Sequence, residues 1–288
     1  TSIHRLSIDL TGVEELRLND DLEELVLLGD MSDNCQILVK DHGASLRLQL
    51  DSSLPKALGL KDLGAIHCSN ILEIDFAQIL NNYPRLRELR LWGKPGHILN
   101  FHKLSEFKEL VNFSTVDLFG FTAEDIPKPE DLPRLSMFWM SSLPEEAAKV
   151  AKKYYKKQQD KGLNLWITKP RKAEWLAQNL DNPFRSWDGQ ENISTANAKK
   201  AASLYRKTRA SVRKLLENPN EDTMKHIEDL IREYTQGFNK MDKRNCFIET
   251  IEREDIYDAL VEILDLLPED LGMDKEKFIE IFDELKDF

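Results

Sequence analysis

A recurring spacing of apolar residues constrains this chain more than any other feature of its sequence. The pattern Leu-x-x-Leu-x-Leu, with related apolar residues admitted, begins at Val13, Leu22, Leu63, Leu86, Phe113 and Leu132. Weaker versions at Leu46–Leu48 and Leu165–Ile167 complete a series whose middle apolar positions are 25, 46, 66, 89, 116, 135 and 165, so the steps are 21, 20, 23, 27, 19 and 30 residues. Steps of about 20–29 residues suit one strand plus a return segment, stacked on its neighbours. The pattern therefore predicts an α/β fold with a parallel sheet.

Alternation inside each motif predicts which strand residues face away from the core, because every second residue of a strand shares one face. The predicted outward positions are Ala65, His67 and Ser69; Glu88, Arg90 and Trp92; Thr115, Asp117 and Phe119; Arg134, Ser136 and Phe138; and Asn164, Trp166 and Thr168. Aromatic residues beside Arg, Glu and Asp have the composition of an interface hot spot. The predicted partner-binding residues are Glu88, Arg90, Trp92, Asp117, Phe119, Arg134, Ser136, Phe138 and Trp166.

The repeated motif resembles that of the leucine-rich repeat family, of an irregular bacterial type, over residues 13–170 and best from Leu63 to Met140. The resemblance implies a solenoid with a parallel concave sheet. The chain departs from the family at the asparagine that usually ends the motif, where it has Lys94, Phe121 and Met140. Two additional strand-like pieces, Leu16–Leu18 and Ile37–Val39, are interpreted as convex-side strands or as an N-terminal capping hairpin.

Helical periodicity and Pro or Gly stops predict helices after several strands and throughout the last hundred residues. The expected helices are 76–83, 99–110, 144–161, 170–180, 195–216, 221–236, 250–267 and 274–285. A turn-rich connector then separates two domains: a repeat domain at 1–182, the connector at 183–195 and an all-α domain at 196–288. The phrases Asn182–Trp187 and Phe247–Glu254 resemble helical domains attached to leucine-rich repeats in uncharacterised bacterial proteins. That likeness implies no established activity.

The charge is negative overall but unevenly distributed. With 51 acidic and 40 basic residues the formal charge is −11, which argues against nucleic acid or anionic membrane binding over the whole surface. Basic residues nevertheless concentrate at 149–161 and 199–214, while the residues from Glu217 onward are strongly acidic. Such runs are typical of solvated helix faces. Pairing of the second basic run with the acidic residues is the alternative left open.

The compartment expected from the sequence is the cytoplasm. The cysteines (Cys35, Cys68 and Cys246) are three in number and far apart, which favours a reducing environment without a disulfide framework. An apolar run of about 18 residues, as a membrane-spanning helix needs, is not found. The first residues, Thr1–Arg5, lack the layout of a signal peptide.

A search for catalytic or cofactor motifs leaves enzymatic activity uncertain and leaning towards none. The chain contains no Gly-x-Ser-x-Gly, phosphate-binding loop or His-Glu-x-x-His. The segment Gly93–Gly96 is interpreted as a turn, and His97 and His102 lack the further ligands of a zinc site. No metal or cofactor is therefore predicted.

The leading hypothesis is a non-catalytic cytoplasmic module that binds an unidentified protein partner on the concave sheet; the acidic C-terminal part would suit a basic partner. A nucleic-acid-associated protein that uses the basic faces at 149–161 and 199–214 is an alternative, which the net charge disfavours. An enzyme site at the domain junction is another alternative. Whether Trp92, Phe119, Phe138 and Trp166 contact a partner or the chain's own C-terminal part is left open.

Overall fold

The computed structural model describes residues 3–29, 35–52, 54, 59–268 and 274–288, and the chain divides into two compact units. Unit 1 comprises Thr1–Leu176 and unit 2 comprises Ala177–Phe288. The division falls inside the short helix α3 (Ala173–Asn179), a few residues before the domain boundary expected at 182. Each unit has its own apolar core.

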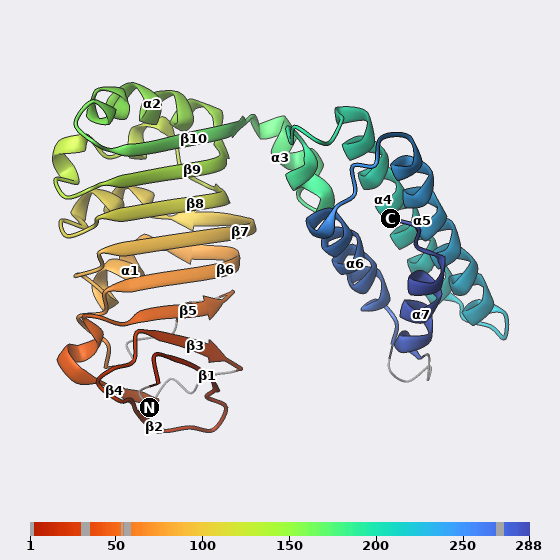
Figure 1. The fold of residues 1–288 in the computed structure, drawn as a ribbon, viewed down its shortest axis with the longest axis horizontal. Coiled ribbons are helices and arrows are strands. Elements are labelled where there is room, and N and C mark those ends of the chain that lie inside the picture. The colour runs from red at the N-terminus through yellow and green to blue at the C-terminus, as the bar shows by residue number, and fades with distance from the viewer. Residues whose placement is uncertain (1–2, 30–34, 53, 55–58, 269–273) are drawn as a thin grey trace. The chain divides into compact units, whose positions relative to one another are not determined.

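Unit 1 is built on a parallel sheet of eight strands (Figure 1), so the predicted mixed α/β class with a parallel sheet is confirmed. In spatial order the strands are β1 (Arg5–Asp9), β3 (Glu24–Leu28), β5 (Arg47–Asp51), β6 (Ala65–Asp75), β7 (Glu88–Leu99), β8 (Asn112–Phe119), β9 (Met137–Pro144) and β10 (Asn164–Arg171). This order follows the chain, so each strand pairs with the strands before and after it in the series.

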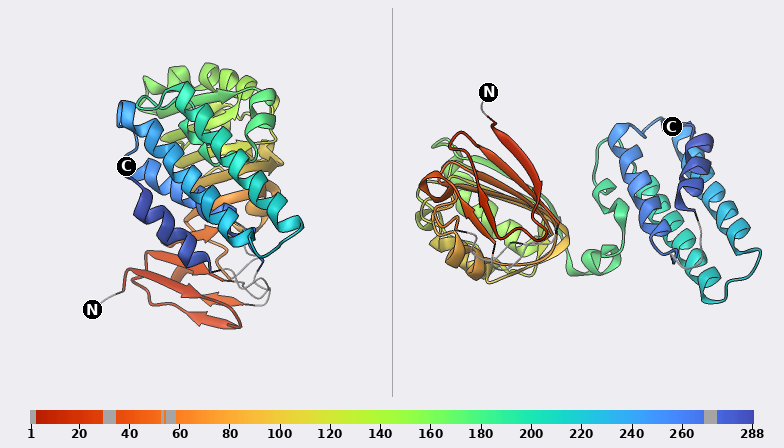
Figure 2. Two further views of the ribbon diagram at one scale, coloured as in Figure 1. Left: turned by 90° about the vertical axis from the view of Figure 1, so that its right-hand side faces the viewer. Right: turned by 90° about the horizontal axis from the view of Figure 1, so that it is seen from below.

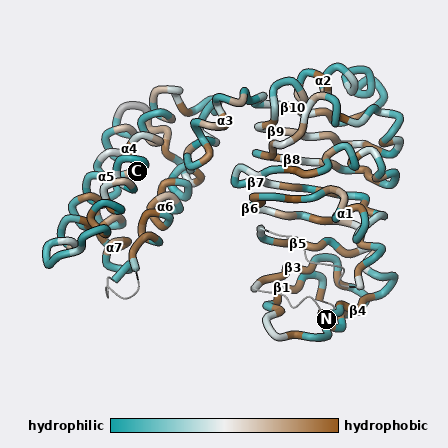
Figure 3. The backbone as a smooth tube through the Cα atoms, turned by 180° about the vertical axis from the view of Figure 1, so that it is seen from behind, coloured by the Kyte–Doolittle hydropathy of each residue, from teal (hydrophilic) through white to brown (hydrophobic). Residues whose placement is uncertain are grey.

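The return segments between these strands lie on one side of the sheet (Figures 1 and 3). They are α1 (Phe76–Asn82), α2 (Glu145–Gln159) and the 3-10 turns η2 (Phe101–Glu106), η3 (Ala123–Asp125) and η4 (Pro129–Asp131). A further 3-10 turn, η1 (Lys40–Gly43), precedes β5. Asp75 caps α1 through its side chain, which accepts a hydrogen bond from the Ala77 amide. The sheet therefore has one face that these segments cover, and a second face that is called the outward face below.

A continuous row of apolar side chains crosses the sheet under the return segments. Paired positions place Leu25, Leu48, Ile66, Leu89, Phe113, Phe138 and Leu165 in register across seven strands. All but the terminal Leu165 are fully buried. The register shows that β8 aligns through Phe113 and β9 through Phe138, whereas the motif spacing marked Val116 and Leu135 as the equivalent positions.

The segment Gly93–Gly96 is part of β7 and not the turn that its glycines suggest. The strand runs through it with a shift in its pairing to β8. A Cβ atom at Gly93 would lie 2.1 Å from the Asp117 carbonyl oxygen, and one at Gly96 would lie 2.3 Å from the Ile71 carbonyl oxygen. These glycines allow close approach of neighbouring backbones. The helix predicted at 99–110 does not form. Strand β7 extends to Leu99, and the 3-10 turn η2 follows it.

A second, two-stranded sheet forms near the start of the chain from β2 (Glu15–Arg17) and β4 (Gln36–Leu38). The two strands pair in parallel, with Glu15 opposite Gln36. A hairpin joins antiparallel strands, so the interpretation as an N-terminal capping hairpin is wrong. The additional strand-like pieces instead pair with each other outside the eight-stranded sheet.

Unit 2 contains four longer helices that pack side by side (Figure 2). They are α4 (Thr195–Glu217), α5 (Thr223–Asn245), α6 (Thr250–Leu264) and α7 (Lys275–Leu285), preceded by the 3-10 turn η5 (Pro183–Trp187). Phe184, Trp187 and Phe238 pack together in the core, and Trp187 Nε1 donates a hydrogen bond of 2.8 Å to Asp255 Oδ2. The ends of α4 and α7 lie within one residue of their predicted positions.

Helix α5 does not end at Gly237, where the sequence predicted a stop. It continues to Asn245. A Cβ atom at Gly237 would lie 2.4 Å from Leu204 Cδ2 on α4. The glycine therefore leaves room for the Leu204 side chain of α4. The sequence alone does not distinguish this role from that of a C-cap, because Gly237 follows a periodic segment.

Candidate functional site

The outward face of the sheet carries polar and aromatic side chains in register. Its first row is Glu24, Arg47, Ala65, Glu88, Asn112, Met137 and Asn164. The second row, two residues further along each strand, is Val26, Gln49, His67, Arg90, Ser114, Trp139 and Trp166. The parallel ladder thus brings residues about 20 positions apart in sequence to adjacent places on one surface.

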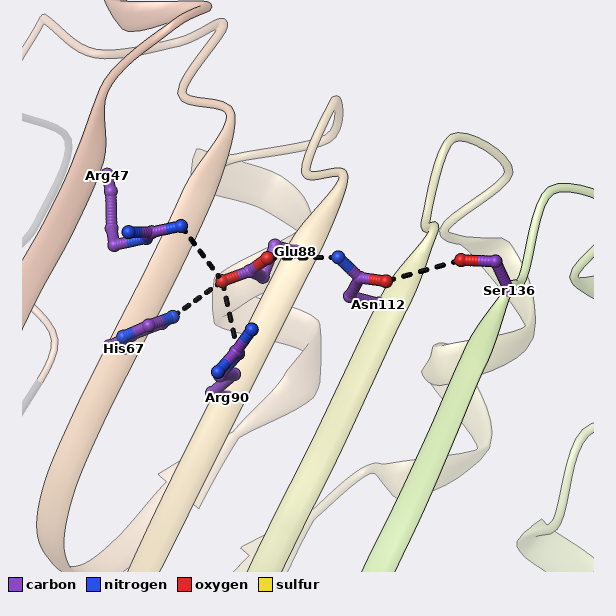
Figure 4. Close-up of polar contacts among 6 residues, drawn as sticks. All are labelled: Arg47, His67, Glu88, Arg90, Asn112 and Ser136. Carbon is purple, nitrogen blue, oxygen red and sulfur yellow. Dashed lines mark hydrogen bonds and ion pairs between the residues drawn. The ribbon is translucent and has the colours of Figure 1, made fainter. Parts of the chain in front are cut away.

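Glu88 is the centre of a polar network on this face (Figure 4). Its Oε1 lies 2.6 Å from His67 Nε2, 3.1 Å from Arg90 Nε and 3.5 Å from Arg47 Nη2. Its Oε2 accepts a hydrogen bond of 3.0 Å from Asn112 Nδ2, and Asn112 Oδ1 accepts one of 3.3 Å from Ser136 Oγ. These residues, contributed by β5 to β8 and the segment before β9, are called the Glu88 cluster.

The Glu88 carboxylate is strongly stabilised in its ionised form. The hydrogen bond with His67 is the largest cause, and with Asn112 and the charge of Arg90 it lowers the pKa of Glu88 to about 2, against the opposing effect of burial. A carboxylate with this pKa is a poor proton acceptor near neutral pH. Glu88 therefore serves to orient Arg47, His67 and Arg90 rather than to transfer a proton.

A shallow hollow of about 530 Å³ lies beside the cluster, at the amino ends of β5 to β8. Its lining includes Arg47, Arg87, Glu88 and Asn112. Arg87 is fixed there because its Nη2 donates a hydrogen bond of 2.6 Å to the Ala44 carbonyl oxygen. At this part of the sheet the charged side chains of the hollow and of the Glu88 cluster are therefore fixed by hydrogen bonds and ion pairs.

Three tryptophans extend the outward face beyond the charged cluster. Trp92 and Trp166 are 40% and 51% exposed, and the partly buried Trp139 packs edge-on against Trp166 with ring centroids 5.7 Å apart. Trp92 approaches the ring of His67, whose centroid is 6.3 Å away. The exposed indole rings on the outward face are therefore those of Trp92 on β7 and Trp166 on β10.

Several residues predicted to bind a partner lie on this face. Glu88, Arg90, Trp92 and Trp166 occupy outward positions. Ser136 precedes β9 and joins the Glu88 cluster through Asn112.

The outward assignment is wrong for Thr115 on β8 and for Phe138 on β9. Phe138 is fully buried and stacks on Phe113 in the core. Asp117 and Phe119 are buried and add no exposed surface, and Asp117 has a left-handed backbone with φ of 51° that ends the alternation of β8. Thr115, a further position expected outward, is 1% exposed because it pairs with the core residues Leu91 and Met140. One-residue register changes of this kind move a whole strand to the other face.

Arg134 also lies apart from the outward rows. It precedes β9, is exposed, and forms an ion pair with Glu109 at 4.0 Å between Nη1 and Oε2. It is therefore not part of the Glu88 cluster.

Sequence reasoning overlooked Arg47, Asn112 and Trp139 as site residues. Arg47 lies in the weak motif Leu46–Leu48, whose spacing does not predict which of its residues face outward. Asn112 and Trp139 adjoin Phe113 and Phe138, and they become outward positions once those phenylalanines are assigned to the core. The sequence does contain a signal, because large aromatic residues such as Phe113 and Phe138 bury more apolar area than Val or Leu. In the structure both are fully buried, whereas Val116 and Leu135 are only partly buried.

Comparison with protein-family models, with curated proteins and with solved structures finds no match to this chain. Within the described residues, no helix is long and apolar enough to cross a membrane. In the same part of the chain, no group of three His, Cys, Asp or Glu side chains is placed to hold a metal ion. The three cysteines are free, and burial raises the pKa of Cys68 to about 12.

Replacing Glu88 with glutamine is expected to lower the free energy of unfolding by about 2–4 kcal/mol at pH 7, because Arg47 and Arg90 lose their shared carboxylate. The folded-state pKa of about 2 lies below the ordinary value of 4.5. The stabilisation is therefore full above the unfolded pKa and is lost as pH falls towards 2. Urea unfolding at pH 7, 5 and 3 measures the difference in free energy of unfolding between the unaltered chain and the variant. This difference should become smaller as the pH is lowered. Glu15→Gln, which breaks an exposed pair with Arg17, is the control and should change stability little. If the difference did not change with pH, the lowered pKa of Glu88 in the folded protein would be wrong.

Proposed function

We propose that unit 1 is a leucine-rich-repeat-like solenoid whose outward face is the concave sheet, and that this face binds a protein partner without catalysing a reaction. Unit 2 is proposed to be an accompanying all-α domain. The motif spacing and the parallel, chain-ordered sheet support the first assignment. The helices of unit 2 and their separate core support the second.

The observation that carries the binding proposal is the combination of exposed tryptophans with oriented arginines on the outward face. Tryptophan and arginine are enriched among residues whose truncation costs the most binding energy. Trp92 and Trp166 are exposed, while Arg47 and Arg90 are held by Glu88 and lose less conformational entropy on binding than mobile side chains would. A preorganised charged centre bordered by aromatic side chains is suited to binding the surface of a protein partner.

The experiment compares partner recovery by the full chain and by the double variant Trp92→Ala/Trp166→Ala. The bait is expressed in its native cells, cross-linked, purified and analysed by mass spectrometry. We expect a specific partner with the unaltered chain and about thirtyfold or greater loss of affinity with the variant, since even one such anchor contributes about 2 kcal/mol or more.

The matched control is Leu38→Ala/Leu180→Ala, which truncates two apolar side chains that are 40% and 53% exposed outside the outward rows. Circular dichroism should show the same helix and strand content in all three proteins. Unchanged recovery with the tryptophan variant, or equal loss with the control, would contradict binding at the outward face.

A further inference from the structure

Helix α4 carries a basic face that its own unit leaves largely unneutralised. The exposed bases are Lys199, Lys200, Arg206, Lys207, Arg213 and Lys214. Lys207 Nζ lies 3.4 Å from Glu233 Oε2, and both side chains are more than half exposed. Among the residues that the structure describes, no ion pair is formed by the other five. Pairing with the acidic part of the chain, left open by the sequence, thus involves one exposed contact, and exposed ion pairs contribute little to stability.

The six bases form a regular pattern along the helix. They occur as three adjacent pairs, at 199/200, 206/207 and 213/214, separated by seven residues. With a rise of about 1.5 Å per residue, consecutive pairs are about 10.5 Å apart, and a seven-residue step returns to nearly the same side of the helix. Because α4 is continuous from Thr195 to Glu217, the pairs lie on one face.

The stability of α4 explains few of these bases. The helix dipole favours cations only in the last turn, and of the six bases only Lys214 stands there. Arg209 and Arg213 place like charges at a four-residue spacing, which is destabilising. In a chain with a net charge of −11, an unpaired basic face is better explained by an acidic partner.

We propose that the basic face of α4 binds an acidic α-helix of another protein, in which carboxylates recur every seven residues. Such a helix presents charge at the same spacing of about 10.5 Å. Duplex nucleic acid instead presents about one charge per 1.7 Å of its axis. The 22 acidic and nine basic residues from Glu217 to Phe288 would also repel a polyanion that extends beyond α4. This surface is separate from the outward face of unit 1, and its test does not depend on that proposal.

The test uses two fluorescent synthetic peptides of identical composition with the full-length chain. One peptide is an alanine-based helix with adjacent glutamates repeated every seven residues, and the other has the same glutamates in an irregular order. Fluorescence anisotropy at low salt should give at least about tenfold tighter binding of the regular peptide, and this preference should weaken as salt is added.

Matched charge reversals identify the surface. Lys199→Glu/Arg206→Glu/Arg213→Glu should abolish the preference, whereas Lys152→Glu/Lys153→Glu/Lys156→Glu on α2 makes the same change in net charge and should preserve it. All of these replaced residues are exposed, and an alanine triple at 199, 206 and 213 provides a second test if the reversed helix does not fold by circular dichroism. Equal affinity for both peptides, equal loss with the α2 variant, or tighter binding of a duplex DNA competitor would each overturn the proposal.

Discussion

Replacing Phe138 with alanine is expected to lower the free energy of unfolding by about 3–5 kcal/mol. The ring is fully buried on the covered side of β9. Its centroid lies 5.6 Å from that of Phe113 and 4.5 Å from that of Tyr155. The substitution removes these contacts and leaves a cavity between the sheet and α2. Urea unfolding of the full chain, followed by circular dichroism and by hydrogen exchange in β8 and β9, measures the loss.

Trp139→Ala is the matched control because it truncates a large aromatic side chain on the next residue of the same strand. Trp139 belongs to the outward face and is partly exposed, so its loss should cost less than half as much stability. If the two variants were equally destabilised, or if the order were reversed, the register of β9 described above would be wrong.

Replacing Gly93 with alanine is expected to destabilise unit 1 by several kcal/mol, on the order of 3 or more. The added Cβ would lie 2.1 Å from the Asp117 carbonyl oxygen and 2.6 Å from the Gly96 backbone nitrogen. Both obstacles are backbone atoms, so no side-chain rotation relieves the clash, and β7 and β8 must separate. A lower unfolding midpoint and faster hydrogen exchange in these two strands would report it.

Gly12→Ala tests whether the effect comes from the close approach rather than from the loss of a glycine. No atom lies within 4 Å of a Cβ at Gly12, but its φ of 76° is left-handed, so alanine should cost about 1 kcal/mol. A cost at Gly93 no greater than this would show that β7 and β8 do not meet at the described distance.

The general architecture of unit 1 could be predicted because its repeats are spaced by one strand and one return segment. Ile66 and Leu89 were placed correctly in the core, and the parallel arrangement followed from the steps between motifs. In β8, however, Phe113 and Val116 are both apolar and lie three residues apart, which places them on opposite faces of a strand. The spacing alone does not identify which of them faces the core, and the choice of Val116 reversed the expected faces.

The Glu88 cluster shows a similar limit for the candidate site. Glu88 and Arg90 follow from alternation within one strand. The approach of His67, Asn112 and Arg47 to the same carboxylate depends on the registers of four strands taken together. The roles of Gly93 and Gly237 likewise depend on neighbouring segments that are distant in sequence. Local patterns predict elements and their faces, whereas contacts between elements require the assembled registers.

The apolar row through Leu48, Leu89 and Phe138 also has a consequence for how the protein opens. Each strand of the eight-stranded sheet pairs only with its neighbours in the series, so the stabilising contacts are distributed over successive strand pairs. At the β1 end, Leu6 and Ile8 are only partly buried. Detachment of β1 therefore breaks only its pairing with β3 and leaves the pairing of the central strands intact. Unit 1 can thus unfold locally at this end while the contacts of the Glu88 cluster persist.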